Sequence, residues 1–275
     1  MSSMPIAEVI SENNIVFFAP HYDDFLLGLG GYALALRAES LLASKKFHVV
    51  QIFSRSNYQN NGGAANYEKS LERIKYATGQ RVIEELDCLD ELLGAHAYRY
   101  ELLGELECLL RGKRLSESEM EFPHGMFPDF AEQDWQIYAR LKQAVQAWVD
   151  EPDTALVFPL AIMEHLDHFI TREAGIAVAE ASGPGGRAAF YFQEDKPYAG
   201  LASVEERARI EEFVALHRFE QRVYHTPADE VVALAFKHYA SQVDDSYRKG
   251  VLARAEELRL LNRSTAPCDQ IYRFV

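Results

Sequence analysis

The chain has 275 residues, of which 48% are hydrophobic and 25% charged, so it has enough length and apolar content to bury a core without disulfides. Its 28 basic and 42 acidic side chains give a net charge of −14 at pH 7. This balance argues against nucleic acid or an anionic membrane as a partner, because both need clustered positive charge. Three scattered cysteines argue against a disulfide framework or a Cys-x-x-Cys metal site, so reduced thiols of a cytoplasmic protein are the simplest interpretation.

The N-terminal residues contain no basic segment followed by an apolar one, so we expect no signal peptide. The longest apolar runs, such as 25–36, are shorter than the ~20 residues that a membrane-spanning helix needs. We therefore expect a cytoplasmic protein without membrane insertion. Because no change of composition marks a second domain, a single domain is expected over residues 1–275.

The predicted elements alternate along the chain between short apolar strands and longer helices. Strands are expected at 15–19, 47–54, 95–102, 154–160, 188–193 and 219–226. Helices are expected at about 25–43, 67–93, 131–150, 164–181, 204–216, 228–246 and 250–261. Continuous apolar runs such as 15–19 are typical of strands buried on both faces. The alternation predicts an α/β fold, in which a mostly parallel sheet lies between two layers of helices.

Two regions have a more particular composition. Residues 104–130 combine glycines, prolines and charges, which predicts an insertion or a lid rather than a regular element. In 131–150, large apolar side chains recur at helical spacing from Trp135 to Trp148, and we expect this stripe to lie in the core.

A first polar cluster follows the strand at 15–19 directly. It contains His21, Asp23 and Asp24, and His21 and Asp24 are three residues apart, so one turn can aim both at the same point. In an open α/β sheet, ligands bind beyond the carboxyl ends of the strands, where this cluster lies. Imidazole nitrogen together with carboxylate oxygen suits zinc and related divalent ions.

A second cluster, 164–168, follows the strand at 154–160. His165 and His168 are also three residues apart and face the same way at the start of a helix. A catalytic metal needs three protein ligands and one open position, and His21, Asp24 and one of these two histidines would supply the three. Each cluster alone is more often a helix cap or a structural pair, but their shared place at strand ends favours a metal site.

The glycines at 28–33 fit the pattern Gly-x-Gly-x-x-Ala, which suggests a dinucleotide-binding turn. Such a turn must follow its strand immediately, whereas Gly28 comes nine residues after Ala19 and inside a helical pattern. We therefore expect these glycines to serve close helix–sheet packing. An NADP-dependent reductase stays as an alternative, since Arg55 after the second strand could suit a 2′-phosphate.

Both clusters lie in longer segments that resemble the signatures of a known family. APHYDDFLLGLGG (19–31) and VFPLAIMEHLDH (157–168) resemble the two catalytic segments of the PIG-L/LmbE-like deacetylases. Weaker agreement lies at Arg81-x-x-Glu84, at 190–198 and at 237–242. The resemblance covers about residues 15–246 and implies a Rossmann-like fold, a bound Zn²⁺ and hydrolysis of N-acyl groups, most often the acetyl group of a glucosamine unit.

The resemblance also implies a role for each residue of the two clusters. His21, Asp24 and His168 would be the zinc ligands. Asp23 would be the general base, His165 the general acid and oxyanion partner, and Asp167 the residue that orients a histidine. Zinc would polarise the amide carbonyl and bring the pKa of a bound water to about 7.

The chain departs from the family's pattern at three places. Tyr22 replaces the usual proline, and Phe25 stands where a glutamate usually follows the paired aspartates. Met163 and Glu164 stand where glycines commonly precede the second segment. None of these changes removes a proposed ligand or the base, but together they indicate a side branch of the family with its own substrate.

The sequence therefore predicts a zinc-dependent deacetylase that acts on a small amino-sugar-containing molecule. Hydrolysis of another amide or ester by the same site, and a catalytically silent sugar-binding protein, remain alternatives. Arg55, Arg81 and Tyr198 are candidates for substrate contacts, although a surface arginine or a packing tyrosine explains each as well. Family members are often oligomers, but no segment here identifies an interface.

Overall fold

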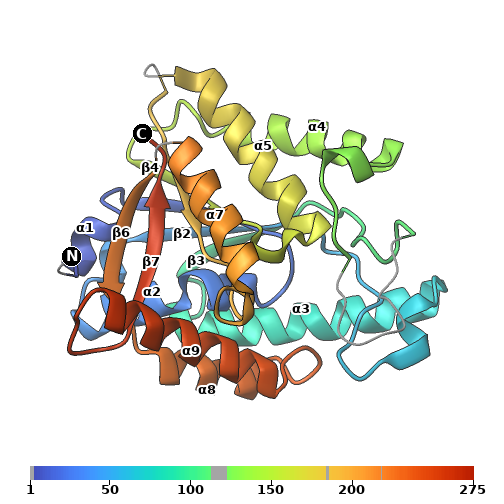
Figure 1. The fold of residues 1–275 in the computed structure, drawn as a ribbon. Coiled ribbons are helices and arrows are strands. Elements are labelled where there is room, and N and C mark those ends of the chain that lie inside the picture. Colours follow the sequence, from blue (N-terminus) through green and yellow to red (C-terminus); the bar gives the residue numbers. More distant parts are fainter. Residues whose placement is uncertain (1–2, 113–122, 184–185, 218) are drawn as a thin grey trace.

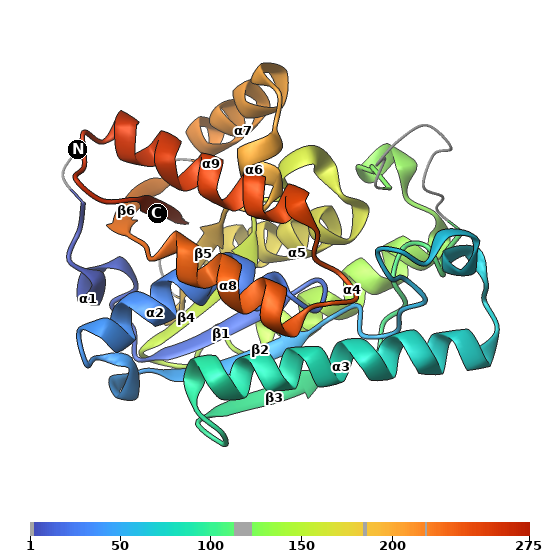
Figure 2. The same cartoon turned by 90° about the horizontal axis from the view of Figure 1, so that it is seen from below.

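The computed structural model describes residues 3–112, 123–183, 186–217 and 219–275. Its centre is an open sheet of seven strands in the order β3-β2-β1-β4-β5-β7-β6, with helices on both faces (Figures 1 and 2). The first five strands in this order are parallel, and β7 runs antiparallel between β5 and β6. This arrangement confirms the expected α/β fold with a mostly parallel sheet.

The bounds of the elements follow the expected order along the chain. The strands are β1 (Asn14–Ala19), β2 (Lys46–Gln51), β3 (Tyr98–Leu102), β4 (Thr154–Pro159), β5 (Ala189–Gln193), β6 (Glu220–His225) and β7 (Cys268–Arg273). The α-helices are α1 (Ile6–Val9), α2 (Gly31–Ala38), α3 (Leu71–Leu93), α4 (Glu132–Gln146), α5 (Leu166–Ser182), α6 (Tyr198–Leu201), α7 (Val204–Leu216), α8 (Ala228–His238) and α9 (Asp245–Leu261). A π-helical turn, η1 (Leu26–Gly30), precedes α2, and 3₁₀ turns lie at η2 (Leu42–Ser44), η3 (Gly63–Tyr67), η4 (Phe127–Asp129) and η5 (Ile162–Glu164).

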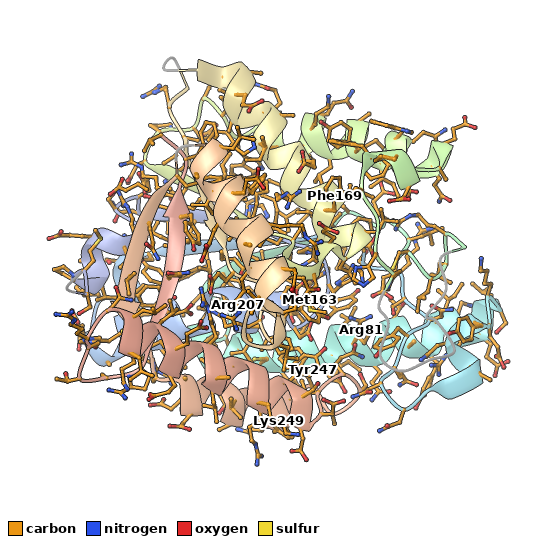
Figure 3. The ribbon with its side chains drawn as sticks, in the orientation of Figure 1. Arg81, Met163, Phe169, Arg207, Tyr247 and Lys249 are labelled. Atoms are coloured by element: carbon orange, nitrogen blue, oxygen red, sulfur yellow. The ribbon has the colours of Figure 1, made fainter. Side chains whose placement is uncertain are left out.

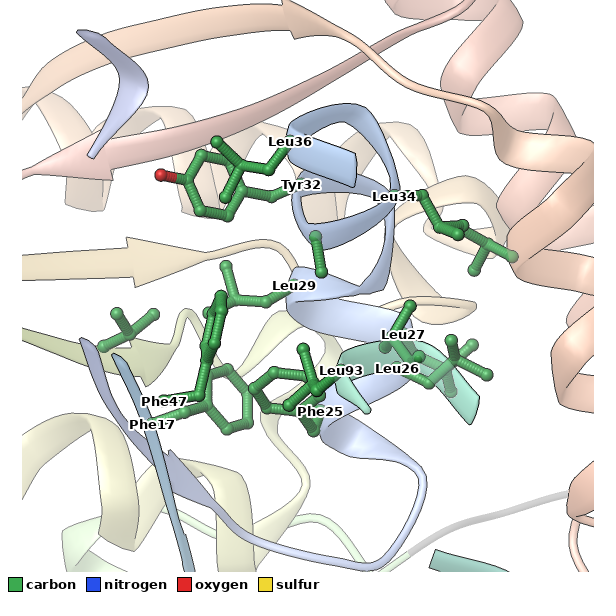
Figure 4. Packing of buried hydrophobic residues seen from close by; sticks show 14 of the residues in the cluster. Phe17, Phe25, Leu26, Leu27, Leu29, Tyr32, Leu34, Leu36, Phe47 and Leu93 are labelled. Carbon is green, nitrogen blue, oxygen red and sulfur yellow. The ribbon is translucent and has the colours of Figure 1, made fainter. Parts of the chain in front are cut away.

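The sheet separates two hydrophobic cores, because successive side chains of a strand point to opposite faces. On β1, Ile15 and Phe17 pack toward α2, α3, α8 and α9, whereas Val16 and Phe18 pack toward α4 and α5. Phe25 lies in the first core and contacts the rings of Phe17 and Phe47 edge-on (Figure 4).

The glycines of the 28–33 segment pack closely against other elements. A Cβ atom on Gly28 would lie 2.8 Å from the Gln193 side chain, and one on Gly31 would lie 2.2 Å from the hydroxyl of Thr226. Both glycines lie within helical turns rather than in the loop that follows β1. Their position therefore serves helix packing and does not form a phosphate-binding turn.

Several expected elements differ in the structure. The helix expected at 228–246 ends at His238, because Tyr239 and Ser241 turn toward α3 and donate hydrogen bonds to the buried carboxylates of Glu85 (2.7 Å) and Glu84 (2.6 Å). The strand β7 was not expected at all. Two of its polar residues, Asp269 and Gln270, are buried, so its sequence lacks the apolar run of a core strand.

The expected core stripe of α4 is only partly correct. Leu141 and Val145 are buried, but Trp135 is 46% exposed and stacks on Phe127, with ring centroids 5.5 Å apart. The aromatic ring is therefore shielded by a neighbouring ring rather than by the sheet.

The region expected to be an insertion or lid, 104–130, is described except for 113–122, which lies outside the described residues. Its two described parts contact the site loops, through bridges that pair Leu106 with Arg55 and His124 with His165. The single domain and the lid stay predictions. Among the described residues, no helix combines the length and hydropathy that a membrane span requires.

Candidate active site

The two predicted clusters meet at one edge of the sheet. β1 pairs with β2 on one side and with β4 on the other, so the chain changes direction across the sheet between β1 and β4. A crevice opens at the carboxyl ends of strands at such a switch point. The loop after β1 carries the first cluster and the segment between β4 and α5 carries the second, which places both at this crevice.

Three ligand atoms from these clusters converge on one point. The distance from His21 Nδ1 to His168 Nε2 is 3.1 Å, from His168 Nε2 to Asp24 Oδ2 it is 3.4 Å, and from His21 Nδ1 to Asp24 Oδ2 it is 3.7 Å. Tetrahedral zinc with ligand bonds of 2.0–2.1 Å separates its ligands by about 3.3–3.4 Å. Two imidazole nitrogens and a carboxylate oxygen at this spacing therefore fit a divalent zinc ion.

Each histidine of this triangle is oriented by a carboxylate on its other ring nitrogen. His21 Nε2 lies 2.9 Å from Asp167 Oδ2, and His168 Nδ1 makes a short hydrogen bond with Asp195 Oδ1. Carboxylates in this position fix the tautomer and the ring orientation of metal-binding histidines. Although burial alone would lower it, Asp24 and Asp195 raise the pKa of His168 to about 9, which shows how strongly the site attracts positive charge.

Asp167 is itself held in place by a buried cation. Its carboxylate accepts hydrogen bonds from the Arg111 guanidinium (2.7 Å) and from the backbone N–H of Cys108 (3.0 Å). Burial would raise the pKa of Asp167, but Arg111 and His21 hold it well below its usual range. Asp167 therefore remains ionised behind His21.

Asp23 lies beside the ligand triangle in an unusual backbone conformation. Its φ angle is +86°, in the left-handed region that disfavours side chains, and such strain is typical of functional sites. Its backbone N–H donates to Glu85 Oε2 (2.9 Å), which also accepts the hydroxyl of Tyr239 (2.7 Å). Burial and the neighbouring Asp24 raise the pKa of the Asp23 carboxyl well above its usual value, which suits a group that accepts and returns a proton.

His165 is buried beside the triangle, with its ring centroid 4.8 Å from that of His21 and 5.2 Å from that of His168. Its Nδ1 accepts the backbone N–H of Asp167 (3.3 Å), so the ring proton is placed on Nε2. Burial and the nearby His21 lower the pKa of His165 well below its usual value. The ring is therefore a neutral imidazole that can donate a hydrogen bond from Nε2.

All six residues at the two clusters are brought together, and five of them line one cavity. Its volume is about 100 Å³, and Tyr58, Tyr198 and Tyr247 form an aromatic part of its wall. Tyr247 and Arg81 also line it and can be followed in Figure 3. The sixth residue, Asp167, lies behind His21.

The predicted substrate contacts are placed differently. Tyr198 lines the cavity, with its ring 6.3 Å from that of His168. Arg81 lines it too, but its guanidinium is engaged with Glu107 and Ser56 and lies over the ring of Tyr22. Arg55 is exposed and is not one of the described residues that line the cavity.

Sequence reasoning missed Asp195 and Arg111. Asp195 is the second residue after β5, the strand next to β4, so its place at a neighbouring strand end was a usable signal. Arg111 lies in the irregular region 104–130, where no periodic pattern indicates which side chains turn inward.

The segment before His165 carries three side chains in the left-handed region. The φ angles of Ala161, Met163 and Glu164 are +56°, +64° and +58°. Glycine adopts this conformation without strain, whereas Met163 and Glu164 carry side chains there and are in strained positions.

Comparison with known proteins gives a fold rather than a family. No family model matches the chain, and no curated protein matches its sequence. Solved structures do match: the zinc-inhibited form of teicoplanin deacetylase Orf2 at a TM-score of 0.63 and 19% identity, over 95% of this chain and 98% of that chain. The A40926 pseudoaglycone deacetylase Dbv21 matches at a TM-score of 0.59 and 17% identity, over 96% of this chain and 98% of that chain.

A third structure of the same kind is more distant in sequence. The N,N′-diacetylchitobiose deacetylase from Pyrococcus horikoshii, in complex with its inhibitor MPG, matches at a TM-score of 0.58 and 13% identity, over 98% of this chain and 90% of that chain. At these identities the likeness shows that the chain shares the fold of these deacetylases along nearly its whole length.

Proposed function

We propose that the protein is a zinc-dependent N-deacetylase of the PIG-L/LmbE-like family that acts on a small amino-sugar-containing molecule. The observation that carries this proposal is the convergence of His21, Asp24 and His168 on one point, with Asp23 and His165 on the wall of the same cavity. The fold supports it, because three solved structures that share it are named as deacetylases and one of them is a zinc-inhibited form.

His21, Asp24 and His168 would hold the zinc ion, and Asp167 and Asp195 would orient the two imidazoles. Bound zinc supplies a Lewis acid for the amide carbonyl and lowers the pKa of a bound water. One carboxylate and two neutral imidazoles leave a net positive charge at the site, which preserves this acidity.

Asp23 moves the proton in this proposal. Its carboxylate accepts a proton from the attacking water, and the raised pKa of the carboxyl favours holding that proton until it is passed on. The same carboxyl group then delivers the proton to the amide nitrogen, since an amine leaves only when it is protonated. The hydrogen bond from the Asp23 backbone to Glu85 keeps the base in position through this cycle.

His165 stabilises the negative charge that develops on the carbonyl oxygen. Its neutral ring with the proton on Nε2 is a hydrogen-bond donor toward the cavity, and a donor placed before the reaction needs no reorganisation. The lowered pKa favours this donor role over a permanently protonated imidazolium.

The wall of the cavity supports a sugar with a short acyl group. Tyr58, Tyr198 and Tyr247 offer rings and hydroxyls to a sugar. The volume of about 100 Å³ formed by the described residues suits acetyl better than a long acyl chain.

The direct test measures metal and acetate together. Purified protein is expected to contain about one zinc per chain by elemental analysis. The zinc-loaded protein is then incubated with a panel of N-acetylated sugars and conjugates, and released acetate and free amine are measured by mass spectrometry. Sugar binding without release would favour the silent sugar-binding alternative, and NADPH oxidation by metal-free protein would favour the reductase.

A further inference from the structure

The two edges of the sheet differ in how their backbone groups are satisfied. At one edge, the N–H of Met4 donates to the carbonyl oxygen of Val223 on β6 (2.7 Å), so the N-terminal segment covers part of that strand. At the other edge, β3 ends the sheet and pairs with β2 alone among the described strands (Figure 2). A strand whose outer N–H and C=O groups are unpaired is a template for a further strand.

The hydrogen bonds of β3 indicate which of its backbone groups face outward. The N–H of Leu103, directly after β3, donates to the carbonyl oxygen of Gln51 on β2 (2.8 Å). Because backbone groups alternate between the two sides of a strand, the N–H and C=O groups that face outward are those of Tyr98, Tyr100 and Leu102. No backbone hydrogen bond joins these outward groups to another described segment.

The side chains of β3 complement a second copy of the same strand in the antiparallel direction. When two such strands pair with Tyr100 opposite Tyr100, Arg99 of each copy lies opposite Glu101 of the other. Both side chains are exposed and, being two residues apart, point to the same face of the sheet. Their backbone groups face β2, so they form non-hydrogen-bonded pairs, in which opposite side chains are closest.

Other pairings of the same strand are less favourable. A parallel pairing in register would place Arg99 beside Arg99 and Glu101 beside Glu101, and like charges opposite each other destabilise a strand pair. Moving the antiparallel axis by one residue, to Arg99 or to Glu101, also places like charges opposite each other. The two charges therefore select both the direction and the register.

The charge of Glu101 is not neutralised by its neighbour within the chain. Its carboxylate, 51% exposed, lies 3.3 Å from His48 Nε2 on β2. Burial lowers the pKa of His48, so the ring is neutral near pH 7 and is a hydrogen-bond partner rather than a cation. The carboxylate thus keeps its charge for an arginine of a second copy.

The helix before β3 extends this surface. Tyr76 and Ile83 on α3 are 61% and 62% exposed, and their seven-residue spacing puts them on the helix face that includes Asp90. Asp90 accepts the hydroxyl of Tyr98 (2.9 Å), so this face borders the edge strand. A five-residue strand alone falls short of the ~1,000 Å² that a specific interface buries, and these apolar side chains add area. Asp87 on the same face and the net charge of −14 oppose association.

We propose that β3 is a self-association edge, at which two copies of this chain pair antiparallel about a twofold axis through Tyr100. The two sheets then form one continuous sheet, held by backbone hydrogen bonds and by two Arg99–Glu101 pairs. Because the net charge opposes association, the dimer forms at high protein concentration. Neither a metal ion nor the proposed deacetylation enters this inference.

Sedimentation equilibrium of the full chain over a range of concentrations measures the association. The unaltered protein is expected to dimerise with a dissociation constant below about 1 mM. Arg99→Glu and Glu101→Arg each place like charges opposite one another at both symmetric positions, so each should weaken the dimer about tenfold or more. Both side chains are exposed, so the variants should fold, and circular dichroism checks this.

Two combinations restore the charge pattern. The double variant Arg99→Glu/Glu101→Arg exchanges the two charges and should regain the affinity of the unaltered protein. An equimolar mixture of the two single variants should form a heterodimer, because every pair then joins opposite charges. Lys249→Glu changes the net charge as Arg99→Glu does, at an exposed position on α9 (Figure 3), and should leave the dimer nearly unchanged.

Three results would overturn the self-association edge. The first is a protein that remains monomeric at about 1 mM. The second is a dimer that neither single charge reversal weakens, which would place the interface elsewhere. The third is a double variant that associates no better than the single variants, since the loss would then not come from the pairing of the two charges.

Discussion

The two loops that build the site are fixed in different ways. The loop after β1 is held through its backbone, since the strained Asp23 donates its N–H to Glu85 on α3. The segment after β4 is held through side chains from elsewhere, because Asp195 accepts both the N–H of Ile162 (3.0 Å) and the ring of His168. The contact with Glu85 positions the base of the first loop, and the contact with Asp195 orients the metal ligand His168 of the second. Changes at Asp23 and at Asp195 should therefore separate turnover from metal binding.

The largest effect is expected for Asp23→Asn. The amide has nearly the shape of the carboxylate but cannot accept and return a proton, so kcat should fall by about 10²–10⁴-fold. The backbone hydrogen bond to Glu85 does not involve the changed group, so the loop should keep its place. Steady-state kinetics with the best substrate of the panel gives the measurement.

The metal content of Asp23→Asn shows whether this side chain acts only as the base. Asp23 is not a proposed ligand, so the zinc content and affinity of the variant should match those of the unaltered protein. Full activity in this variant would remove Asp23 from the role of base, and loss of zinc would show that the Asp23 side chain also supports the ligands of its loop.

Asp195→Asn should have the next largest effect, and on metal rather than on proton transfer. Removing its charge weakens the support of His168, and the loss of such a partner lowers metal affinity or activity by about 10–100-fold. Competition with a zinc-binding dye measures the affinity. Asp87→Asn, an exposed carboxylate on α3, is the matched control and should leave affinity unchanged. Equal affinities for both variants would refute the orienting role.

Glu85→Gln tests how the residue that accepts the Asp23 backbone N–H contributes to the free energy of unfolding. Burial raises the pKa of Glu85 to about 7, from an ordinary value of 4.5. A carboxyl with a raised folded-state pKa contributes stability below its unfolded pKa and loses it as pH rises through the folded value. The protein should therefore lose on the order of 2 kcal/mol between about pH 4.5 and 7 on account of this group.

The glutamine variant resembles the protonated carboxyl and should lack this loss. Urea unfolding of both proteins across that pH range gives the comparison, with Glu230→Gln as the control for an exposed carboxylate. The difference between variant and unaltered protein should grow with pH. A constant difference would show that Glu85 does not titrate in the folded state over this range.

The same contrast explains how far the sequence could predict the molecule. Runs such as Ile15–Ala19 and Thr154–Pro159 are buried on both faces, so their apolar composition revealed the parallel half of the sheet. The antiparallel edge was harder to recognise, because β7 buries Asp269 against Lys196, at 2.5 Å, and Gln270 against Glu194. A strand that buries paired polar groups has no apolar signature.

In the site, too, some residues could be predicted from the sequence and others could not. The residues of the two clusters are close in sequence, and parallel strand ends lie at one edge of the sheet, so their meeting could be predicted. The supports come from distant segments: Arg111 from an irregular region, Asp195 from the loop after β5 and Tyr239 from the end of α8. Such partners depend on three-dimensional packing, which local spacing does not encode.

The smallest effect is expected in the strained segment before His165. Glu164 has a φ of +58°, and within the described part of the chain its side chain makes one long ion pair, with Arg209 (3.5 Å), which contributes little at the surface. Glu164→Gly removes a left-handed strain of about 1–2 kcal/mol, partly offset by the greater freedom of glycine in the unfolded chain, for a net gain of about 0.5–1 kcal/mol.

Glycine at an exposed helical position gives the opposite sign and serves as the control for this last change. Gln143→Gly on α4 should cost about 1 kcal/mol, because no left-handed strain is relieved there. Urea unfolding of both variants measures the two changes. A loss of stability in Glu164→Gly would mean that the side chain stabilises the loop by more than its backbone strain costs, and the second loop would then owe its shape to Glu164 as well as to Asp195.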